Sequence, residues 1–341
     1  MDFKAVNMIC IEYWIDSQPD RNLIAAMDCS FIPKSGKKTP GLDYYYSGCA
    51  NRTLKGLEIS AIAVVNADSR ECLSLDVRQT PANTGTKDSG ESRMDLYYEQ
   101  LVDCMPQLQQ LKIQHIAVDG AYAKHNFVKK TTKLGIDIIS KLRRDCRLKY
   151  LYQGARTGKK GRPKQFDGMV NFSDLTRFSK VQAALEEDDI YETIVYSVSL
   201  KCKIKLALIV RENGKKKSFV ILFSTDLSLT ALEIYKYYAA RFQIEFIFRD
   251  AKQNTGLCDC QSTNAKALNF HFNASLVALN CARAEHYKKE QNKPFSIESI
   301  KRENYNELYL NLIISKLGLK PDLIKNEQLY QELIAFGTIA A

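Results

Sequence analysis

Four polar side chains share one narrow stripe of a helix that the sequence predicts over residues 237–253. They are Tyr238, Arg241, Glu245 and Lys252. At about 100° per residue they fall within about 60° of one another, and most of the remaining circumference is apolar, which predicts a buried helix. The rings of Phe242 and Phe246 are accordingly expected to point into the protein core. A buried helix with such a stripe needs a charged partner for the stripe to face.

Two aspartates upstream can provide that partner. Asp28 interrupts the apolar run 22–32, and Asp119 ends the buried run 112–120. Each carboxylate also has a structural explanation: a hydrogen-bonded strand residue, a turn residue, or an ion pair within the helix. However, an unpaired buried carboxylate is costly, and three carboxylates on rigid elements supply the hard oxygen ligands that two Mg²⁺ ions about 3.5–4 Å apart need for phosphodiester cleavage. We therefore predict that Asp28, Asp119 and Glu245 are catalytic and bind two Mg²⁺ ions.

The elements that must position these carboxylates follow the order β-β-β-α-β-α-β. Apolar and β-branched runs predict the strands, and helical spacing with a glycine stop predicts the helices. The predicted ranges are a strand at 22–32, an antiparallel hairpin at 57–79, a helix at 93–108, a strand ending at Asp119, a helix at 123–135 and a strand at 136–142. An acidic residue in the first strand, a second after the fourth strand and a third on a later helix are typical of a ribonuclease-H-like α/β fold. We predict a mixed sheet flanked by helices.

The segment between this core and the helix that carries Glu245 has a different composition. Residues 143–165 combine clustered charge with glycine, and residues 191–225 are rich in β-branched and aromatic residues. We predict a β-rich insertion before the Glu helix, whose N-cap is Ser228 or Thr230. The expected division is 20–142 for the first part of the catalytic core, 143–226 for the insertion, 227–290 for the second part of the core and 291–341 for a helical tail.

The charge of the chain favours a polyanionic partner. The formal net charge is +10 and the pI is about 9.0, which indicates nucleic acid as the leading candidate. Residues 141–164 hold ten Lys and Arg against one Asp, and we expect this run to contact DNA, with a solvated loop as the alternative. The expected contacts in this run are Lys159, Lys160, Arg162 and Lys164. Arg241 and Lys252 are expected to contact phosphates, and Tyr238 to position the DNA strand.

The cysteines and histidines do not form a recognisable metal motif. The ten cysteines include no paired C-x-x-C sets, and only four histidines are present, so we expect reduced and mostly buried thiols in a cytoplasmic protein. His115 and His125 are expected to be core or surface residues and not ligands. No apolar run approaches the roughly 20 residues that span a bilayer, and the N-terminus lacks a signal-peptide layout.

The helix segment matches a known signature. Tyr238-x2-Arg241-x3-Glu245-x6-Lys252 resembles the Y-x2-R-x3-E-x6-K signature of the DDE transposases of bacterial insertion sequences, and "STDLSL" and "AVDGAYA" are also similar to that family. The resemblance covers roughly residues 20–285. It implies a ribonuclease-H-like domain that uses two Mg²⁺ ions, with Mn²⁺ as a substitute, to cleave transposon ends and transfer the 3′-hydroxyl to target DNA. It also implies double-stranded DNA as partner, self-association on DNA and a bacterial, nucleoid-associated location.

Two departures from that family lead to further expectations. Relatives carry a separate N-terminal DNA-binding region, and because Asp28 is close to Met1 we expect a truncated copy or a shortened reading frame. Some relatives hold a flipped base with a tryptophan of the insertion, but the single tryptophan here is Trp14, which leaves Tyr150 or Tyr152 for stacking. The alternative functions are a stand-alone ribonuclease-H-like nuclease and a non-catalytic transposase remnant that binds DNA.

Overall fold

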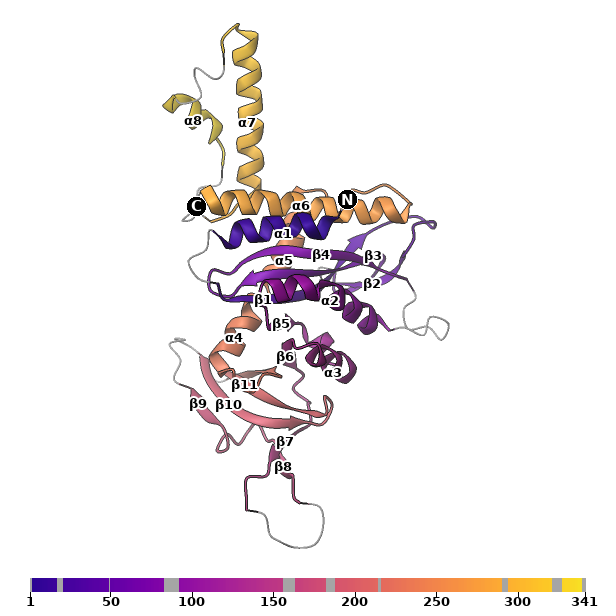
Figure 1. The fold of residues 1–341 in the computed structure, drawn as a ribbon, viewed down its shortest axis with the longest axis vertical. Coiled ribbons are helices and arrows are strands. Elements are labelled where there is room, and N and C mark those ends of the chain that lie inside the picture. The colour runs from indigo at the N-terminus through magenta and orange to yellow at the C-terminus, as the bar shows by residue number, and fades with distance from the viewer. Residues whose placement is uncertain are drawn as a thin grey trace.

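A single twelve-stranded mixed sheet, covered by helices, organises the protein (Figure 1). The structure is a computed structural model, and it describes residues 2–16, 21–48, 50–82, 92–155, 163–181, 188–213, 216–289, 294–320 and 327–338. The main path of the sheet has the order β2-β3-β1-β5-β6-β12-β11-β10-β7-β8, with β4 paired to β3 and β9 paired to β10.

The first six strands confirm the predicted ribonuclease-H-like core and include one strand, β2, that was not predicted. They are β1 (Leu23–Pro33), β2 (Asp43–Ser47), β3 (Arg52–Asn66), β4 (Glu71–Thr80), β5 (His115–Val118) and β6 (Asp137–Leu142). Strand β3 pairs antiparallel with both β1 and β4, whereas β5 lies parallel to β1 and to β6. The order β4-β3-β1-β5-β6 therefore places β1 at the centre of the core, with β5 beside it.

The strands of residues 143–226 extend the same sheet and do not form a separate one. They are β7 (Leu148–Leu151), β8 (Phe166–Met169), β9 (Ser179–Val181), β10 (Asp188–Ser197), β11 (Cys202–Asn213) and β12 (Lys216–Ser224). The last of them, β12, pairs antiparallel with β6 and so joins this region to the core. The β-rich character of the region is as predicted, and one short strand, β7, lies within the charged segment 143–165. The division into domains stays a prediction.

Helices cover both faces of the sheet. Helices α1 (Phe3–Ile15), α2 (Arg93–Gln110) and α3 (His125–Lys133) pack on one face, and α4 (Ala231–Ala240), α5 (Gln243–Asn254) and α6 (Ala265–Lys289) cover the other. Strand residues alternate between the two faces. In β1, Ala25 and Met27 pack with the first helix group, and Ile24 and Ala26 pack with the second. Position 28 therefore belongs to the face that α4 and α5 cover.

The N-terminal helix α1, which the sequence analysis did not anticipate, is part of the core. Trp14 is fully buried, and its Nε1 donates to Glu71 on β4 at 3.0 Å. The side chain of Asn280 on α6 donates to Asn7 on α1 and also bonds both backbone groups of Ser74 on β4. Buried amides therefore fasten α1 and α6 to the same strand, because polar groups removed from water must find partners inside the protein.

The predicted single helix before and after Arg241 is wrong, because the structure divides it into α4 and α5. Thr230 is the N-cap of α4, as predicted, and forms a capping box with Glu233. At the junction Phe242, Ile244 and Glu245 donate their backbone N–H groups to carbonyls three residues back, the tighter 3₁₀ pattern. No glycine or proline marks this break, so local sequence carries no signal for it.

The prediction that Phe242 and Phe246 point into the core is also wrong. Phe242 is 47% exposed, and Phe246 is partly exposed and packs edge-on against it. Ile244, Ile247 and Phe248 form the buried face of α5 instead. Arg249 stacks over the outer Phe246 ring.

The C-terminal residues form the predicted helical tail. Helix α7 (Ile297–Lys316) stands away from α6 in Figure 1, and α8 (Gln328–Ile334) lies beside it. Asn306 donates to the carbonyl of Ile334, and Tyr330 donates to Asn311, which holds the two helices together. No helix in the described part of the chain is long and apolar enough to cross a membrane. The nine cysteines within the described ranges are all free.

The buried face of α5 leads to a stability prediction. Phe248→Ala should lower the free energy of unfolding by about 3–5 kcal/mol because it opens a cavity beneath the sheet. Phe242→Ala, whose ring is 47% exposed, should cost less than about 1 kcal/mol. Urea denaturation of both variants measures the difference. Equal losses for the two variants would contradict the assignment of the faces.

Candidate active site

The pairing register of two parallel strands brings the two aspartates together. In the β1–β5 pair, Met27 lies opposite Val118. Asp28 and Asp119 are the next residues along each strand, so they lie side by side at about the 4.8 Å spacing of neighbouring strands. Alternation places both on the sheet face that α4 and α5 cover, since Ala26 and Ala117 belong to that face.

The turn after β5 holds Asp119 close to the neighbouring strand. The hydroxyl of Ser140 on β6 donates to the backbone carbonyl of Asp119 at 3.1 Å. A Cβ at Gly120 would lie 3.0 Å from the carbonyl oxygen of Lys141, so a side chain there would push the turn away from β6. Asp119 caps the short helix η1 (Gly120–Tyr122) with its backbone only. Its carboxylate is therefore available to a ligand.

Arg241 joins the first aspartate to the glutamate. Its Nη1 donates to Asp28 Oδ2 at 2.8 Å, and its Nη2 donates to Glu245 Oε1 at 3.0 Å. The Arg241 side chain is only 10% exposed, whereas that of Glu245 is 40% exposed. The Arg241 Nε has no hydrogen-bond partner among the described residues. The guanidinium thus supplies positive charge between two of the three predicted carboxylates.

Burial is the main influence on the protonation of Asp28. It raises the pKa of Asp28 to about 6, while Arg241 and the Cys29 backbone N–H act in the opposite direction. The charges of Glu245 and Asp119 raise this pKa further, which shows that the three carboxylates form one electrostatic group. The site therefore favours added positive charge.

Tyr238 and Lys252 occupy different parts of this face. Tyr238 is half-buried, the guanidinium of Arg241 lies over its ring, and burial raises the pKa of its hydroxyl. Lys252 lies about two helical turns beyond Glu245 on α5. Its charge acts on the thiol of Cys258, in the loop that follows α5. The predicted stripe thus extends from the carboxylates to this loop.

The three predicted carboxylates provide the type of donor atom that divalent metal ions such as Mg²⁺ bind. Asp28, Asp119 and Glu245 supply hard oxygen donors on two strands and a helix, and Arg241 shows where positive charge is favoured. Within the described part of the chain, the ligand oxygens of these three carboxylates do not all lie within 4.8 Å of one another. The guanidinium lies between Asp28 and Glu245 in this structure, so these two carboxylates are held by Arg241.

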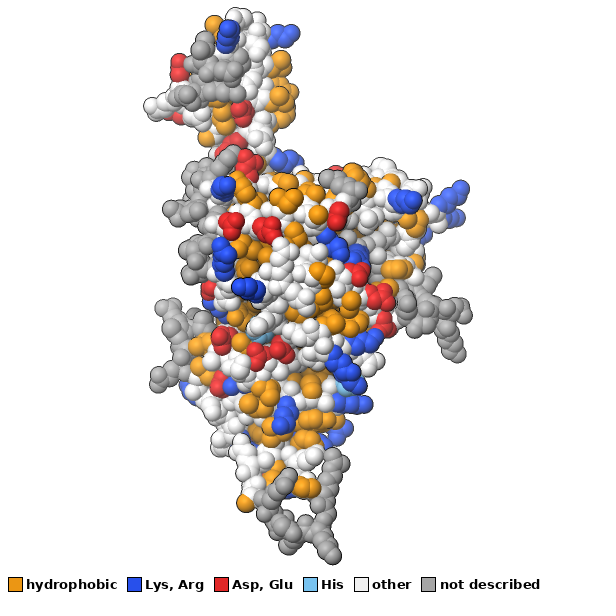
Figure 2. Space-filling model, in the orientation of Figure 1, with side chains coloured by type: hydrophobic (Ala, Val, Ile, Leu, Met, Phe, Trp, Pro, Cys, Tyr) orange, Lys and Arg blue, Asp and Glu red, His pale blue; other side chains and the backbone are white. Residues whose placement is uncertain are grey.

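A basic groove of about 420 Å³ adjoins the Asp119 turn. Gly120 and Ala123 form one side of it, and Val198 and Ser199 from the β10–β11 turn form the other. Its basic residues are Lys124, Lys141, Arg143 and Arg147. Lys and Arg side chains also gather at the right-hand edge of the face in Figure 2, level with α3. Three of these four residues belong to the predicted basic run 141–164.

Of the four DNA contacts predicted in the basic run, the structure describes Lys164. Lys159, Lys160 and Arg162 lie outside the described residues. Lys164 forms an ion pair with Asp167 at 2.7 Å and lies over the Tyr152 ring, far along the sheet in the insertion. Tyr150 is buried against Phe178 and Arg177. Of the two tyrosines proposed for base stacking, only Tyr152 is thus partly exposed.

The sequence analysis missed a second basic groove. It has a volume of about 460 Å³ and lies between the end of β1 and the loop after α5. Lys34, Lys37 and Lys38 line one side, and Cys258 and Cys260 line the other. The segment 33–53 is rich in Gly, Lys and Tyr, and its lysines six to ten residues after Asp28 were the available signal. The charge of Lys252 acts on Cys258, which lines this groove.

Comparison with known proteins identifies the family. The profile described as Transposase DDE domain matches residues 21–281, which includes both aspartates and the Glu245 helix. Among solved structures, the NurA nuclease from Sulfolobus solfataricus is similar at 10% identity and a TM-score of 0.29, over 86% of this chain and 97% of that chain. No curated protein sequence matches. Divalent-metal dependence and DNA binding are typical of the matched family, and with three carboxylates gathered on a ribonuclease-H-like sheet, this chain belongs to the DDE transposases.

Proposed function

We propose that the protein cleaves DNA at transposon ends and joins the freed 3′-hydroxyl to target DNA, with Asp28, Asp119 and Glu245 as ligands of two Mg²⁺ ions. The observation that carries this proposal is the β1–β5 register, which aligns Asp28 with Asp119 on the face where Glu245 and Arg241 lie. When bound, the metal ions would activate water and neutralise charge on the phosphate. We also propose that the protein self-associates on DNA and works at the bacterial nucleoid.

The protein's own residues have separate proposed roles. Asp28 and Asp119 would hold ligands from the rigid sheet, and Glu245 would complete the set from α5. Arg241 would preserve the spacing of Asp28 and Glu245 before metal binds, and then be available to a DNA phosphate. Tyr238 would position the reacting strand.

Phosphate binding is assigned to the basic surfaces. The groove beside Gly120 adjoins the Asp119 turn. Lys252, on the same helix as Glu245, acts on Cys258, which lines the groove at Lys34. Such contacts give affinity without sequence specificity. The basic run that includes Lys159, Lys160, Arg162 and Lys164 is assigned to DNA farther from the reacting phosphate.

The carboxylate assignment predicts the loss of metal-dependent cleavage. Asp28→Ala, Asp119→Ala and Glu245→Ala should each abolish nicking of transposon-end DNA in Mg²⁺, because each change removes a metal ligand. Asp174→Ala, at an exposed position of the insertion, is the control and should cleave normally. A gel assay with labelled end DNA measures cleavage, and thermal melts check folding. Normal cleavage by a folded Asp119→Ala protein would refute the assignment.

The burial of Asp28 predicts a pH effect on the metal-free protein. Because burial raises its pKa from 3.8 to about 6, the folded state binds this proton more tightly than the unfolded chain does. Ionising Asp28 should therefore lower the free energy of unfolding by about 3 kcal/mol as the pH rises from about 4 to about 6. Urea denaturation in EDTA should show this decrease in the wild type relative to Asp28→Asn. Parallel pH profiles of the two proteins would contradict it.

The proposed phosphate contacts predict a change in salt dependence. Replacing Lys124, Arg143 and Arg147 together by Ala should weaken binding to all DNA sequences and reduce the slope of log K against log salt by about 0.9 per lost contact. Lys252→Ala should reduce this slope by about 0.9, the value for one lost phosphate contact. Lys316→Ala, an exposed charge on α7, is the control. Titrations at several salt concentrations measure the slopes. An unchanged slope in the triple variant would show that the groove beside Gly120 does not bind DNA phosphates.

A further inference from the structure

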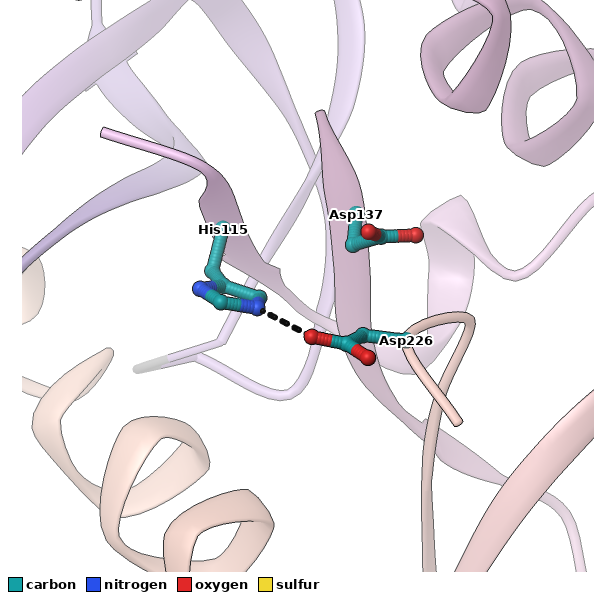
Figure 3. A group of neighbouring side chains, drawn as sticks. All are labelled: His115, Asp137 and Asp226. Atoms are coloured by element: carbon teal, nitrogen blue, oxygen red, sulfur yellow. Dashed lines mark hydrogen bonds and ion pairs between the residues drawn. The ribbon is translucent and has the colours of Figure 1, made fainter. Parts of the chain in front are cut away.

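A second group of potential metal ligands lies at the opposite end of β5 from Asp119 (Figure 3). His115 is the first residue of β5, Asp137 is the first residue of β6, and Asp226 follows the end of β12. His115 and Asp137 lie directly opposite each other in the parallel register. One ligand atom from each of the three residues lies within 4.8 Å of the others. At about 3.3 Å per residue, this group is about 13 Å along β5 from Asp119.

Neighbouring groups orient each of these side chains. His115 Nε2 lies 2.9 Å from Asp226 Oδ2, and the Tyr237 ring packs against the imidazole. The other oxygen of Asp226 accepts from the Ser228 backbone N–H at 2.9 Å and from its hydroxyl at 2.6 Å. Thr225 donates to Asp137 Oδ1 at 2.7 Å. Supporting hydrogen bonds of this kind are typical around metal ligands, because they fix the direction of the free donor atoms.

The charges of the group are not balanced by basic side chains. Within the described ranges, no lysine or arginine forms an ion pair with Asp137 or Asp226, whose side chain is 22% exposed. Although burial raises the pKa of Asp226, hydrogen bonds from Ser228 and His115 lower it overall. Two carboxylates held this close repel each other unless a cation lies between them. A metal ion bound by both carboxylates would supply that positive charge.

We propose that His115, Asp137 and Asp226 bind a divalent transition-metal ion of the Zn²⁺ class. One imidazole nitrogen and two carboxylate oxygens form a mixed donor set that suits Zn²⁺ better than Mg²⁺, with water in the remaining position. The neutral imidazole would coordinate through Nε2, so the metal replaces the His115–Asp226 hydrogen bond. His115 was predicted to be a core or surface residue and not a ligand, and Asp226 is 111 residues away from it in the chain.

The position of this site indicates a structural role. It joins two core strands to the connection between β12 and α4, where the chain returns from the insertion. Helix α4 then leads directly to Arg241 and Glu245. A metal ion here would fasten the start of this helix to the sheet and so stabilise the position of the Glu245 segment. This role does not depend on the proposed transposition chemistry.

The test measures metal binding by the full chain after treatment with EDTA and dialysis. The protein carries Asp28→Asn and Asp119→Asn, so that the proposed catalytic site does not contribute. Calorimetric titration with Zn²⁺ should show one equivalent bound, and Zn²⁺ should raise the melting temperature. Co²⁺ in place of Zn²⁺ should give a visible spectrum without thiolate charge-transfer bands, which separates this site from the cysteines.

Ligand variants in the same background decide the outcome. His115→Gln and Asp137→Asn should each weaken Zn²⁺ binding at least tenfold and remove the rise in melting temperature. Asp137→Asn keeps an acceptor for Thr225, so it tests the site even if His115→Gln does not fold. His125→Gln is the matched control, because His125 bonds a backbone carbonyl, and it should bind Zn²⁺ like the parent. Absence of Zn²⁺ binding, thiolate bands with Co²⁺, or undiminished binding by Asp137→Asn would overturn the proposal.

Discussion

One buried guanidinium connects parts of the core that lie 213 residues apart in the chain. Arg241 donates to Asp28 on the central strand and to Glu245 on α5, and it stands at the junction between α4 and α5. Removing Arg241 would leave two carboxylates close together without a counter-charge, which is far more costly than losing one exposed ion pair. This contact occurs at the break between α4 and α5, beside the exposed Phe242, and it includes Glu245.

The sheet supplies the rigidity that such a contact requires. Helices cover it on both faces, so strand β1 is buried on either side and its register with β5 is strongly determined. A shift of one residue would turn Asp28 to the face of α2 and α3, away from Arg241. Because β12 pairs with β6, the insertion continues this sheet, and its turn residues Val198 and Ser199 reach the groove beside Gly120.

The two ends of β5 carry different chemistry. The Asp119 end offers only carboxylate oxygens, with positive charge already supplied by Arg241, and it adjoins a basic groove. The His115 end combines an imidazole with two carboxylates, and no described lysine or arginine forms an ion pair with those carboxylates. This difference in donor atoms and charge separates a site suited to Mg²⁺ and phosphate from one suited to a structural transition metal.

The sequence by itself determined most of the order of strands and helices in the core, the β-rich character of residues 191–225 and a helix N-cap at Ser228 or Thr230, and it indicated three carboxylates for one site. These follow from local periodicity, capping chemistry and the spacing of the helix stripe, all of which act over a few residues. Only the tertiary structure decided the break at Arg241, the outward Phe242, the packing of α1, and the meeting of His115, Asp137 and Asp226. Each of these depends on contacts between segments distant in the chain, such as Asn7 with Asn280. The local pattern of apolar and polar residues does not predict such contacts.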